Sequence, residues 1–314
     1  MSIFSKQKVL VTGGAGFIGS HQADALVSAG YKVIVIDDLS NGEESNLNSE
    51  AKFYKVDIRS EDKMEEVFSH ERPEYVFHFA AQANVNRSVE DPVFDADVNI
   101  MGSLNLLELS LKYKIKKFMF SSTGGALYGD AEILPTPEDY PTEPISPYGI
   151  AKLSVEKYLR FYFEQFGLEY GINRYANVYG PRQNPRGEAG VISIFIEKMS
   201  KGLQPIIHGD GHQTRDYVYV GDVVRANMLV FESEAVEIYN VGTGRQTTVN
   251  EIFNLIKEAI GSSATERHGD DFSGQAVSCL STEKIKRDLG WEPQVGIEEG
   301  IEKTVEWFRE KTRG

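Results

Sequence analysis

Short apolar runs alternate with helical patterns along residues 8–175, and this alternation is the feature that most constrains the fold. Each run has the length and the continuous apolar character of a strand that is buried on both faces. Strands that are separated by helices pair in parallel through right-handed crossovers, so we expect an α/β fold with a doubly wound parallel sheet. The strands are expected at 8–12, 32–37, 52–56, 75–79, 117–122 and 169–175, and the helices at 17–28, 61–69, 95–113 and 147–166.

The composition changes after Ala176, where Gly, Pro, Asn and Arg become frequent and predict a loop over 177–190. A strand at 237–241 is expected to return to the sheet, and further helices are expected at 191–201, 220–231, 249–260 and 297–310. We therefore expect a smaller, discontinuous lobe that lies over the carboxyl ends of the parallel strands. The nucleotide-binding domain would comprise 1–176 with 235–261 returning to it, and the lobe would comprise 177–234 and 262–314.

A glycine-rich turn, Gly14-Ala-Gly16-Phe-Ile-Gly19, follows the first expected strand and opens the first helix. This spacing is typical of the Rossmann fold, where the glycines allow a tight turn and a close approach of the backbone to a pyrophosphate. The N–H groups and the positive dipole end of the helix then bind the anion. Asp37 ends the next strand, where a carboxylate accepts hydrogen bonds from ribose hydroxyls and repels a 2′-phosphate. The pattern predicts NAD rather than NADP.

Tyr148 and Lys152 stand one turn apart in the helix expected at 147–166, so both side chains lie on one face. Free tyrosine ionises at about pH 10. A neighbouring ammonium and an oxidised nicotinamide would both favour the phenolate, which then acts as a general base. Thr123 directly follows an expected strand, and its hydroxyl would hydrogen-bond the reacting oxygen. Each feature alone also fits ordinary helix or turn chemistry, but their combination with the glycine turn is specific.

This combination resembles the extended short-chain dehydrogenase/reductase family, and within it the UDP-glucose (UDP-galactose) 4-epimerases. The resemblance implies an isomerase that inverts C4 of a UDP-hexose through a transient 4-keto sugar, with hydride passing to NAD⁺ and returning to the opposite face. It runs along essentially the whole chain and is carried by Thr12-Gly-Gly-Ala-Gly-Phe-Ile-Gly19, Asp57-Ile58, His78-Phe-Ala-Ala81, Asn99, Ser121-Ser-Thr123, Tyr148-Gly-Ile-Ala-Lys152, Arg174-Tyr-Ala-Asn177-Val-Tyr-Gly-Pro-Arg182, Arg215-Asp-Tyr217-Val-Tyr-Val220 and Leu289-Gly-Trp291.

The resemblance also implies which residues form the site, with Thr123, Tyr148 and Lys152 as the catalytic residues. The implied NAD-binding residues are Gly13, Gly16, Phe17, Ile18, Gly19, Asp37, Asp38, Leu39, Asn41, Gly42, Asp57, Ile58, Phe79, Ala80, Ala81, Gln82, Asn99, Ser121, Tyr148, Lys152, Tyr175, Asn177 and Val178. The implied substrate-binding residues are Ser122, Thr123, Gly124, Tyr148, Asn177, Gly190, Val191, Arg215, Arg267 and Asp270, and the register of 266–281 stays open.

Several alternatives follow from single positions. Related dehydratases carry an Asp-Glu pair after the hydroxyl-loop threonine, but Gly124 and Gly125 stand here, which disfavours dehydration. Another UDP-sugar, such as a glucuronate or a pentose, would use the same catalytic residues. A non-catalytic NAD-sensing protein would tend to lack the Tyr/Lys pair. By the resemblance, Ser278 occupies the position next to the C2 substituent of the sugar, where a small residue would admit an N-acetyl group.

The chain of 314 residues has a formal net charge of −14, which disfavours nucleic acid and anionic membranes as partners. No signal segment or bilayer-length apolar run is evident, and a single cysteine, Cys279, fits a reducing compartment, so a cytoplasmic protein is expected. We expect no metal, since the histidines of 208–212 flank glycines and favour a loop. The resemblance implies a homodimer that forms through the helices near 99–113 and 148–166.

Overall fold

The computed structural model describes residues 7–186, 190–270 and 275–313. The chain divides into two compact units. The predicted division into 1–176 with 235–261, and 177–234 with 262–314, stays a prediction. The first unit contains Met1–Leu127, Pro144–Asn173 and Asn227–Ile238, and the second contains Tyr128–Glu143, Arg174–Ala226 and Tyr239–Gly314.

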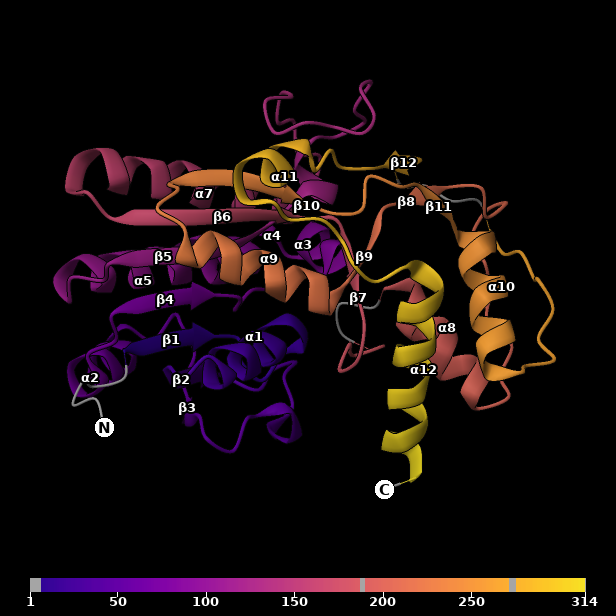
Figure 1. The fold of residues 1–314 in the computed structure, drawn as a ribbon, viewed down its shortest axis with the longest axis horizontal. Helices are drawn as coiled ribbons and strands as arrows, with labels where there is room; N and C mark the ends of the chain where they lie inside the picture. Colours follow the sequence, from indigo (N-terminus) through magenta and orange to yellow (C-terminus); the bar gives the residue numbers. More distant parts are fainter. Residues whose placement is uncertain (1–6, 187–189, 271–274, 314) are drawn as a thin grey trace. The chain divides into compact units, whose positions relative to one another are not determined.

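The main sheet has seven strands in the order β10 (Glu237–Val241), β6 (Glu169–Tyr175), β5 (Lys117–Thr123), β4 (Tyr75–His78), β1 (Lys8–Thr12), β2 (Lys32–Asp37) and β3 (Lys52–Lys55), as Figure 1 shows. β1 pairs in parallel with β2 and with β4, and the β2–β3 and β4–β5 pairs are parallel as well. The strand order therefore reverses beside β1, where doubly wound sheets bind ligands at their carboxyl ends. The predicted α/β fold is confirmed.

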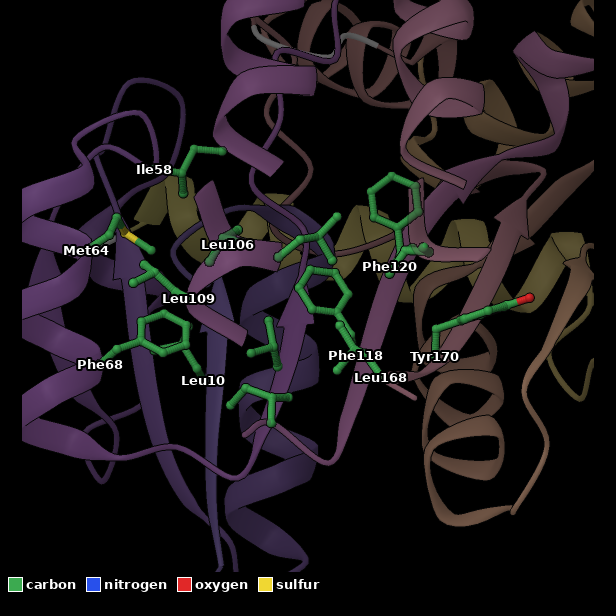
Figure 2. Packing of buried hydrophobic residues seen from close by; sticks show 14 of the residues in the cluster. Leu10, Ile58, Met64, Phe68, Leu106, Leu109, Phe118, Phe120, Leu168 and Tyr170 are labelled. Atoms are coloured by element: carbon green, nitrogen blue, oxygen red, sulfur yellow. The ribbon is translucent and has the colours of Figure 1, made fainter. Parts of the chain in front are cut away.

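Helices cover both faces of the first unit's sheet, because alternate strand residues point to opposite sides. Leu10 and Phe118 are fully buried in the face covered by α2 (Glu61–Glu71), α5 (Gly102–Lys112) and α7 (Pro147–Phe166). Figure 2 shows side chains of this cluster, among them Phe68 of α2 and Leu106 of α5. Phe77 points to the other face, where α1 (Phe17–Ser28) packs on β1 and β2. There its ring centroid lies 5.0 Å from that of Phe231, which belongs to the last turns of α9 (Val220–Glu232).

Capping residues set both ends of α7. The Ser146 side chain accepts a hydrogen bond from the Gly149 N–H, and Pro147 then starts α7. Gly167 ends α7 with φ 75°, a left-handed conformation that favours glycine. α1, α7 and α10 (Val249–Ile260) have the predicted bounds.

The helix predicted at 95–113 is interrupted, so that prediction is corrected. Instead α4 (Pro92–Ala96) leads into a turn of π-helix, η2 (Asp97–Met101), and then into α5. Buried Asn99 lies in this turn, and such turns are frequent at functional sites. The first unit also contains η1 (Glu44–Asn46), α3 (Val85–Glu90) and α6 (Gly124–Leu127), which the sequence analysis did not predict.

The second unit contains two small sheets. One has the order β11 (Thr247–Thr248), β8 (Thr214–Arg215) and β12 (Val277–Ser278), and the other pairs β7 (Asn177–Tyr179) with β9 (Tyr217–Tyr219). β7 corrects the loop predicted over 177–190: this strand forms because its backbone pairs with β9, which is distant in sequence. The helices α8 (Val191–Ser200), α10 and α12 (Ile297–Arg313) enclose an apolar core, and α11 (Glu283–Leu289) was not predicted.

Candidate active site

The glycine turn after β1 packs closely against the protein itself. Gly13 has φ 68°, and a Cβ placed on it would lie 2.6 Å from the backbone nitrogen of Ala80, beyond the end of β4. A Cβ on Gly19 would lie only 2.2 Å from the carbonyl oxygen of Gly13. These two glycines are therefore needed for the turn to approach β4 and for α1 to approach the turn.

Gly16 differs from its neighbours, because space remains beside it. Among the described residues, the only heavy atom within 4 Å of a Cβ on Gly16 would be the Gly13 carbonyl oxygen, at 3.1 Å, apart from adjacent residues. Gly16 is the N-cap residue of α1, and no side chain in the described part of the chain caps the start of that helix. The backbone N–H groups of the first turn, near Phe17 and Ile18, can therefore bind an anion such as a pyrophosphate.

The Asp37 carboxylate connects the end of β2 to the glycine turn by a hydrogen bond. Its Oδ2 accepts a hydrogen bond from the Ala15 N–H at 3.0 Å, and its Oδ1 accepts one from the Leu39 N–H at 2.8 Å. Burial raises the pKa of the Asp37 carboxyl, and these two hydrogen bonds oppose the rise. A Cβ on Gly42 would lie 2.9 Å from the Ala15 carbonyl carbon, so the loop holding Asp38, Leu39 and Asn41 also adjoins the turn.

A buried chain of hydrogen bonds, which the sequence analysis did not anticipate, connects β1, β4 and α5. The Ser103 hydroxyl donates to the Asn99 carbonyl at 2.6 Å, so it accepts from His78 Nε2 at 2.8 Å. His78 Nδ1 is then the acceptor for the Thr12 hydroxyl at 2.7 Å. Burial, and after it the positive charge of Lys152, lower the pKa of His78 to about 3, so the ring is neutral.

Gln82 and Asn99, two residues that were predicted to bind NAD, form hydrogen bonds with each other. Asn99 Oδ1 accepts from the Gln82 N–H at 2.9 Å, and Asn99 Nδ2 donates to the Gln82 carbonyl at 2.8 Å. Oδ1 of buried Asp95 accepts from both side-chain amides, at 3.0 Å from Asn99 and 2.8 Å from Gln82. These amides therefore shape the loop after β4, which also contains Phe79, Ala80 and Ala81.

Asp57 and Ile58, after β3, play different local roles. The Asp57 carboxylate pairs with Arg59 at 2.6 Å, and the hydrogen bonds from Arg59 lower the pKa of Asp57. Ile58 is 5% exposed and belongs to the hydrophobic core. A Cβ on Gly102 would lie 2.6 Å from Ile58 Cδ1, so this isoleucine also limits the approach of α5.

The predicted catalytic residues come from the end of β5 and the first turns of α7. Tyr148 is the second residue of α7, and its neighbour Gly149 fits closely against α6, because a Cβ there would lie 2.6 Å from the Ala126 carbonyl oxygen. Lys152 is 4% exposed, and its Nζ donates to the Ser121 carbonyl at 2.9 Å. Nζ also lies 5.8 Å from the centroid of the Tyr148 ring.

The alternation along β5 separates its three terminal hydroxyls. Ser121 and Thr123 are partly exposed, whereas Ser122 is 3% exposed and points to the other side. The Ser122 hydroxyl, which was predicted to contact substrate, donates to Glu156 Oε1 at 2.5 Å. Gly124 begins α6 directly after Thr123.

The second unit places Arg215 in register with Ser278. The two residues pair between β8 and β12, and Ser278 is 7% exposed. The Arg215 guanidinium donates to the carbonyls of Thr214 and Gln275, each at 2.7 Å. Asp216 is buried, and Thr243 donates to its carboxylate from both backbone and hydroxyl. This anchoring fixes the position of Arg215.

Other predicted residues lie in the same unit, in separate segments. The side chain of Asn177 is exposed in β7, next to Val178, while Tyr175 is buried at the end of β6. Gly190 caps α8, which starts with Val191. The Arg267 and Asp270 carbonyls accept hydrogen bonds from the backbone of 207–209, and residues 271–274 lie outside the described residues.

No helix in the described part of the chain has both the length and the apolar character needed to cross a membrane. The parallel sheet, the glycine turn at its switch point and the Tyr/Lys pair on α7 together define a Rossmann-fold enzyme of the short-chain dehydrogenase/reductase type.

Comparisons with known proteins agree with this class. The model of the NAD dependent epimerase/dehydratase family matches residues 9–242, and the chain belongs to that family. The UDP-glucose 4-epimerase of Thermotoga maritima, solved with UDP-glucose, is 55% identical, with a TM-score of 0.95 and coverage of 98% of this chain and 100% of that one.

Two further proteins are also similar along their whole length. The Thermus thermophilus UDP-glucose 4-epimerase, solved in complex with NAD, is 44% identical with a TM-score of 0.93, covering 96% of this chain and 99% of that one. The putative UDP-glucose 4-epimerase of Methanocaldococcus jannaschii is 47% identical, covering 97% of this chain and 99% of that protein. The predicted family, the NAD cofactor and the 4-epimerase type of isomerase are therefore confirmed.

Proposed function

We propose that this protein interconverts the C4 epimers of a UDP-hexose, with UDP-glucose and UDP-galactose as its substrates. The observation that carries the proposal is the pairing of Tyr148 and Lys152 at the start of α7, beside the hydroxyl-bearing end of β5. Full-length similarity to UDP-glucose 4-epimerases supports the choice of substrate.

In the proposed mechanism, Tyr148 accepts the proton of the sugar 4-hydroxyl. The Lys152 ammonium, held by the Ser121 carbonyl, favours the phenolate form that this step needs. The Thr123 hydroxyl is placed one residue beyond Ser122 at the end of β5, where it would hydrogen-bond the same oxygen. After epimerisation, the Tyr148 hydroxyl returns the proton to the new 4-oxygen, so the base is regenerated in each cycle.

The residues around the glycine turn fit NAD. The space beside Gly16 and the uncapped start of α1 would receive the pyrophosphate, and Asp37 would receive the ribose hydroxyls. When bound, NAD would supply the chemistry of reversible hydride transfer at C4: its oxidised form would accept the hydride and its reduced form would donate it to the opposite face of the sugar. Through its hydrogen bonds to Thr12 and Ser103, the neutral His78 keeps the end of β1 in position beside the glycine turn.

Arg215 is the residue that we propose for the diphosphate. Its guanidinium presents a planar fork that suits phosphate oxygens, and Asp216 keeps its strand in position.

Ser278, in register with Arg215, is proposed to face the C2 substituent of the sugar. Replacing Ser278 with Tyr should abolish the turnover of UDP-GlcNAc but leave the turnover of UDP-glucose in place. Unchanged UDP-GlcNAc turnover in this variant would remove Ser278 from that role.

We also propose a homodimer that uses one apolar face of the first unit. α3, α4 and η2 pack against α7. These elements expose large apolar side chains: Val85, Val89, Val93, Met101, Ile150, Tyr158 and Phe161. Exposed apolar side chains of this size are typical of a subunit interface. Phe161→Glu should give a monomer in sedimentation equilibrium, and Leu203→Glu, at an exposed apolar residue of the second unit, is the matched control. A dimeric Phe161→Glu protein would contradict this surface.

A cytoplasmic location is proposed as well, because the single cysteine, Cys279, is buried and unpaired and fits a reducing compartment. Cell fractionation tests it, and recovery of the protein outside the cytoplasm would contradict it.

The activity is tested by NMR of the purified protein with UDP-glucose and no added cofactor. Appearance of UDP-galactose is expected, and it would also indicate that NAD is retained. UDP-GlcNAc and UDP-glucuronate are compared in the same assay, and the fastest sugar identifies the substrate series. If none of these sugars yields its 4-epimer even after NAD is added, the UDP-hexose proposal is wrong.

A further inference from the structure

The end of β5 is held by α7 at two points, at Ser121 and at Ser122. On one side the Ser121 carbonyl receives a hydrogen bond from Lys152 Nζ at 2.9 Å. On the other side the Ser122 hydroxyl donates to Glu156 Oε1 at 2.5 Å. Ser122 and Glu156 are each 3% exposed and Lys152 is 4% exposed, so these contacts form inside the first unit.

Glu156 shares one side of α7 with the proposed catalytic pair. Tyr148, Lys152 and Glu156 follow each other at intervals of four residues, which is about one helical turn each. The Glu156 carboxylate fixes Ser122, the strand residue that follows Ser121.

The surroundings of Lys152 make this contact important. The ammonium lies 5.8 Å from the centroid of the Tyr148 ring of its own helix and 4.8 Å from that of the Phe120 ring of β5, and its charge acts on neutral His78 of β4. Its hydrogen bond to the Ser121 carbonyl depends on where the end of β5 lies. A displacement of that carbonyl would move the ammonium relative to the Tyr148 phenol.

We propose that Glu156 is a positioning residue for Lys152: through the Ser122 hydroxyl it fixes the Ser121 carbonyl, and that carbonyl holds the ammonium beside Tyr148. The inference rests on the proposed function, because it assigns a part to Glu156 in the same reaction. It is the acceptor oxygen, rather than the charge, that carries this role.

Three variants separate the acceptor from the charge. Glu156→Gln retains an oxygen that accepts from Ser122, so its kcat should stay within about threefold of the natural protein. Glu156→Leu and Ser122→Ala each break the contact, and each should lower kcat by about tenfold or more, since small misplacements of catalytic groups reduce rates strongly. The double variant Ser122→Ala/Glu156→Leu should be no worse than either single variant, because both remove one interaction.

The pH profile distinguishes positioning from general destabilisation. An ammonium that lies farther from the phenol favours the phenolate less, so the acidic limb of kcat should move to higher pH in Glu156→Leu and Ser122→Ala. Ser110→Ala is the matched control, because Ser110 is fully buried and donates to the Leu106 carbonyl at 2.6 Å, within α5. The acidic limb of the Ser110→Ala profile should stay at the same pH, even if the melting temperature of this variant falls.

The same shift can be measured without turnover. In protein loaded with NAD and labelled with ¹³C at the tyrosine ζ carbons, the Tyr148 signal is assigned by its loss in Tyr148→Phe and is titrated with pH. The pKa of Tyr148 should be higher in Glu156→Leu and Ser122→Ala than in the natural protein or in Glu156→Gln. Inactivity of the natural protein would defeat the proposed function, while this titration would still test the positioning.

Three results would overturn the inference. The first is an unchanged Tyr148 titration in both Glu156→Leu and Ser122→Ala. The second is a Glu156→Gln protein as impaired as Glu156→Leu, which would assign the effect to the charge. Additive losses in the double variant would likewise contradict a shared contact.

Discussion

Replacing Gly16 by alanine should weaken cofactor binding while leaving the fold almost intact. The backbone at Gly16 has φ −80° and ψ −175°, an extended conformation that alanine adopts without strain. The new Cβ would lie 3.1 Å from the Gly13 carbonyl oxygen, which requires a shift of only a few tenths of an ångström. It would occupy the space that we assign to the pyrophosphate.

The expected magnitudes differ between folding and binding. Loss of a glycine N-cap and one tight contact should together lower the free energy of unfolding by about 1 kcal/mol. The melting temperature of the NAD-free protein should then fall by about 2–4 °C. A methyl group against the pyrophosphate should lower NAD affinity by about 10- to 100-fold, which corresponds to about 1.4–2.7 kcal/mol.

Gly19→Ala is the contrasting variant. Its Cβ would lie 2.2 Å from the Gly13 carbonyl oxygen, so the backbone of the turn or of α1 must move. Overpacking of this kind typically lowers the free energy of unfolding by about 1–3 kcal/mol, and sometimes by more. Gly19→Ala should therefore lose stability even without NAD, and to a greater extent than Gly16→Ala.

Both quantities can be measured on protein from which NAD has been removed. Calorimetry gives the melting temperature of each variant without NAD, and isothermal titration then gives its NAD affinity. If Gly16→Ala binds NAD as tightly as the natural protein does, the turn does not hold the pyrophosphate in the proposed way. An equal loss of stability in both variants would instead make Gly16 a packing residue like Gly19.

Two further changes test the base and the buried carboxylate of Glu71, which pairs with partly exposed lysines. Tyr148→Phe should lower kcat by at least about 100-fold without changing the NAD content, because it removes the proposed general base; a variant with near-natural epimerisation in the NMR assay would exclude that role. Burial raises the pKa of Glu71, but hydrogen bonds from Lys52, Tyr54 and Lys8 bring it down to about 2. Ionised Glu71 therefore stabilises the fold above about pH 4.5, and this contribution is lost as the pH falls towards 2. Glu71→Gln should lower the free energy of unfolding by at most about 3 kcal/mol at pH 7, since the lysines are partly exposed. At pH 3, about one unit above the folded-state pKa, urea denaturation should find a difference less than about half as large; an equal difference at both pH values would contradict this assignment.

The sequence predicts the long elements well because their ends are chemically marked. Pro147 starts α7 and Gly167 ends it, and Gly261 ends α10 in the left-handed conformation. β1 and β2 were also predicted with their observed bounds, since both are continuous apolar runs buried in the sheet. Local pattern and capping chemistry suffice for such elements, as the whole signal lies within the segment itself.

Elements that depend on distant partners could not be predicted in the same way. β7 has only three residues and exists because it pairs with β9, about forty residues later in the chain. The Thr12–His78 contact likewise follows from the register of β1 on β4, in which these two residues are partners. Neither pairing leaves a periodic signal in its own segment.

Glu156 illustrates the same limit within the candidate site. Its spacing of four residues from Lys152 is also the spacing of an exposed ion pair on a helix surface. Exposed pairs of this kind contribute little, so the pattern alone gives no reason to select this carboxylate. The position of α7 against β5 changes that interpretation, because it buries both side chains and brings Ser122 to the carboxylate. The catalytic pair can thus be recognised from residue types and spacing, whereas the residue that we propose to position it emerges only once the packing of the helix on the strand is known.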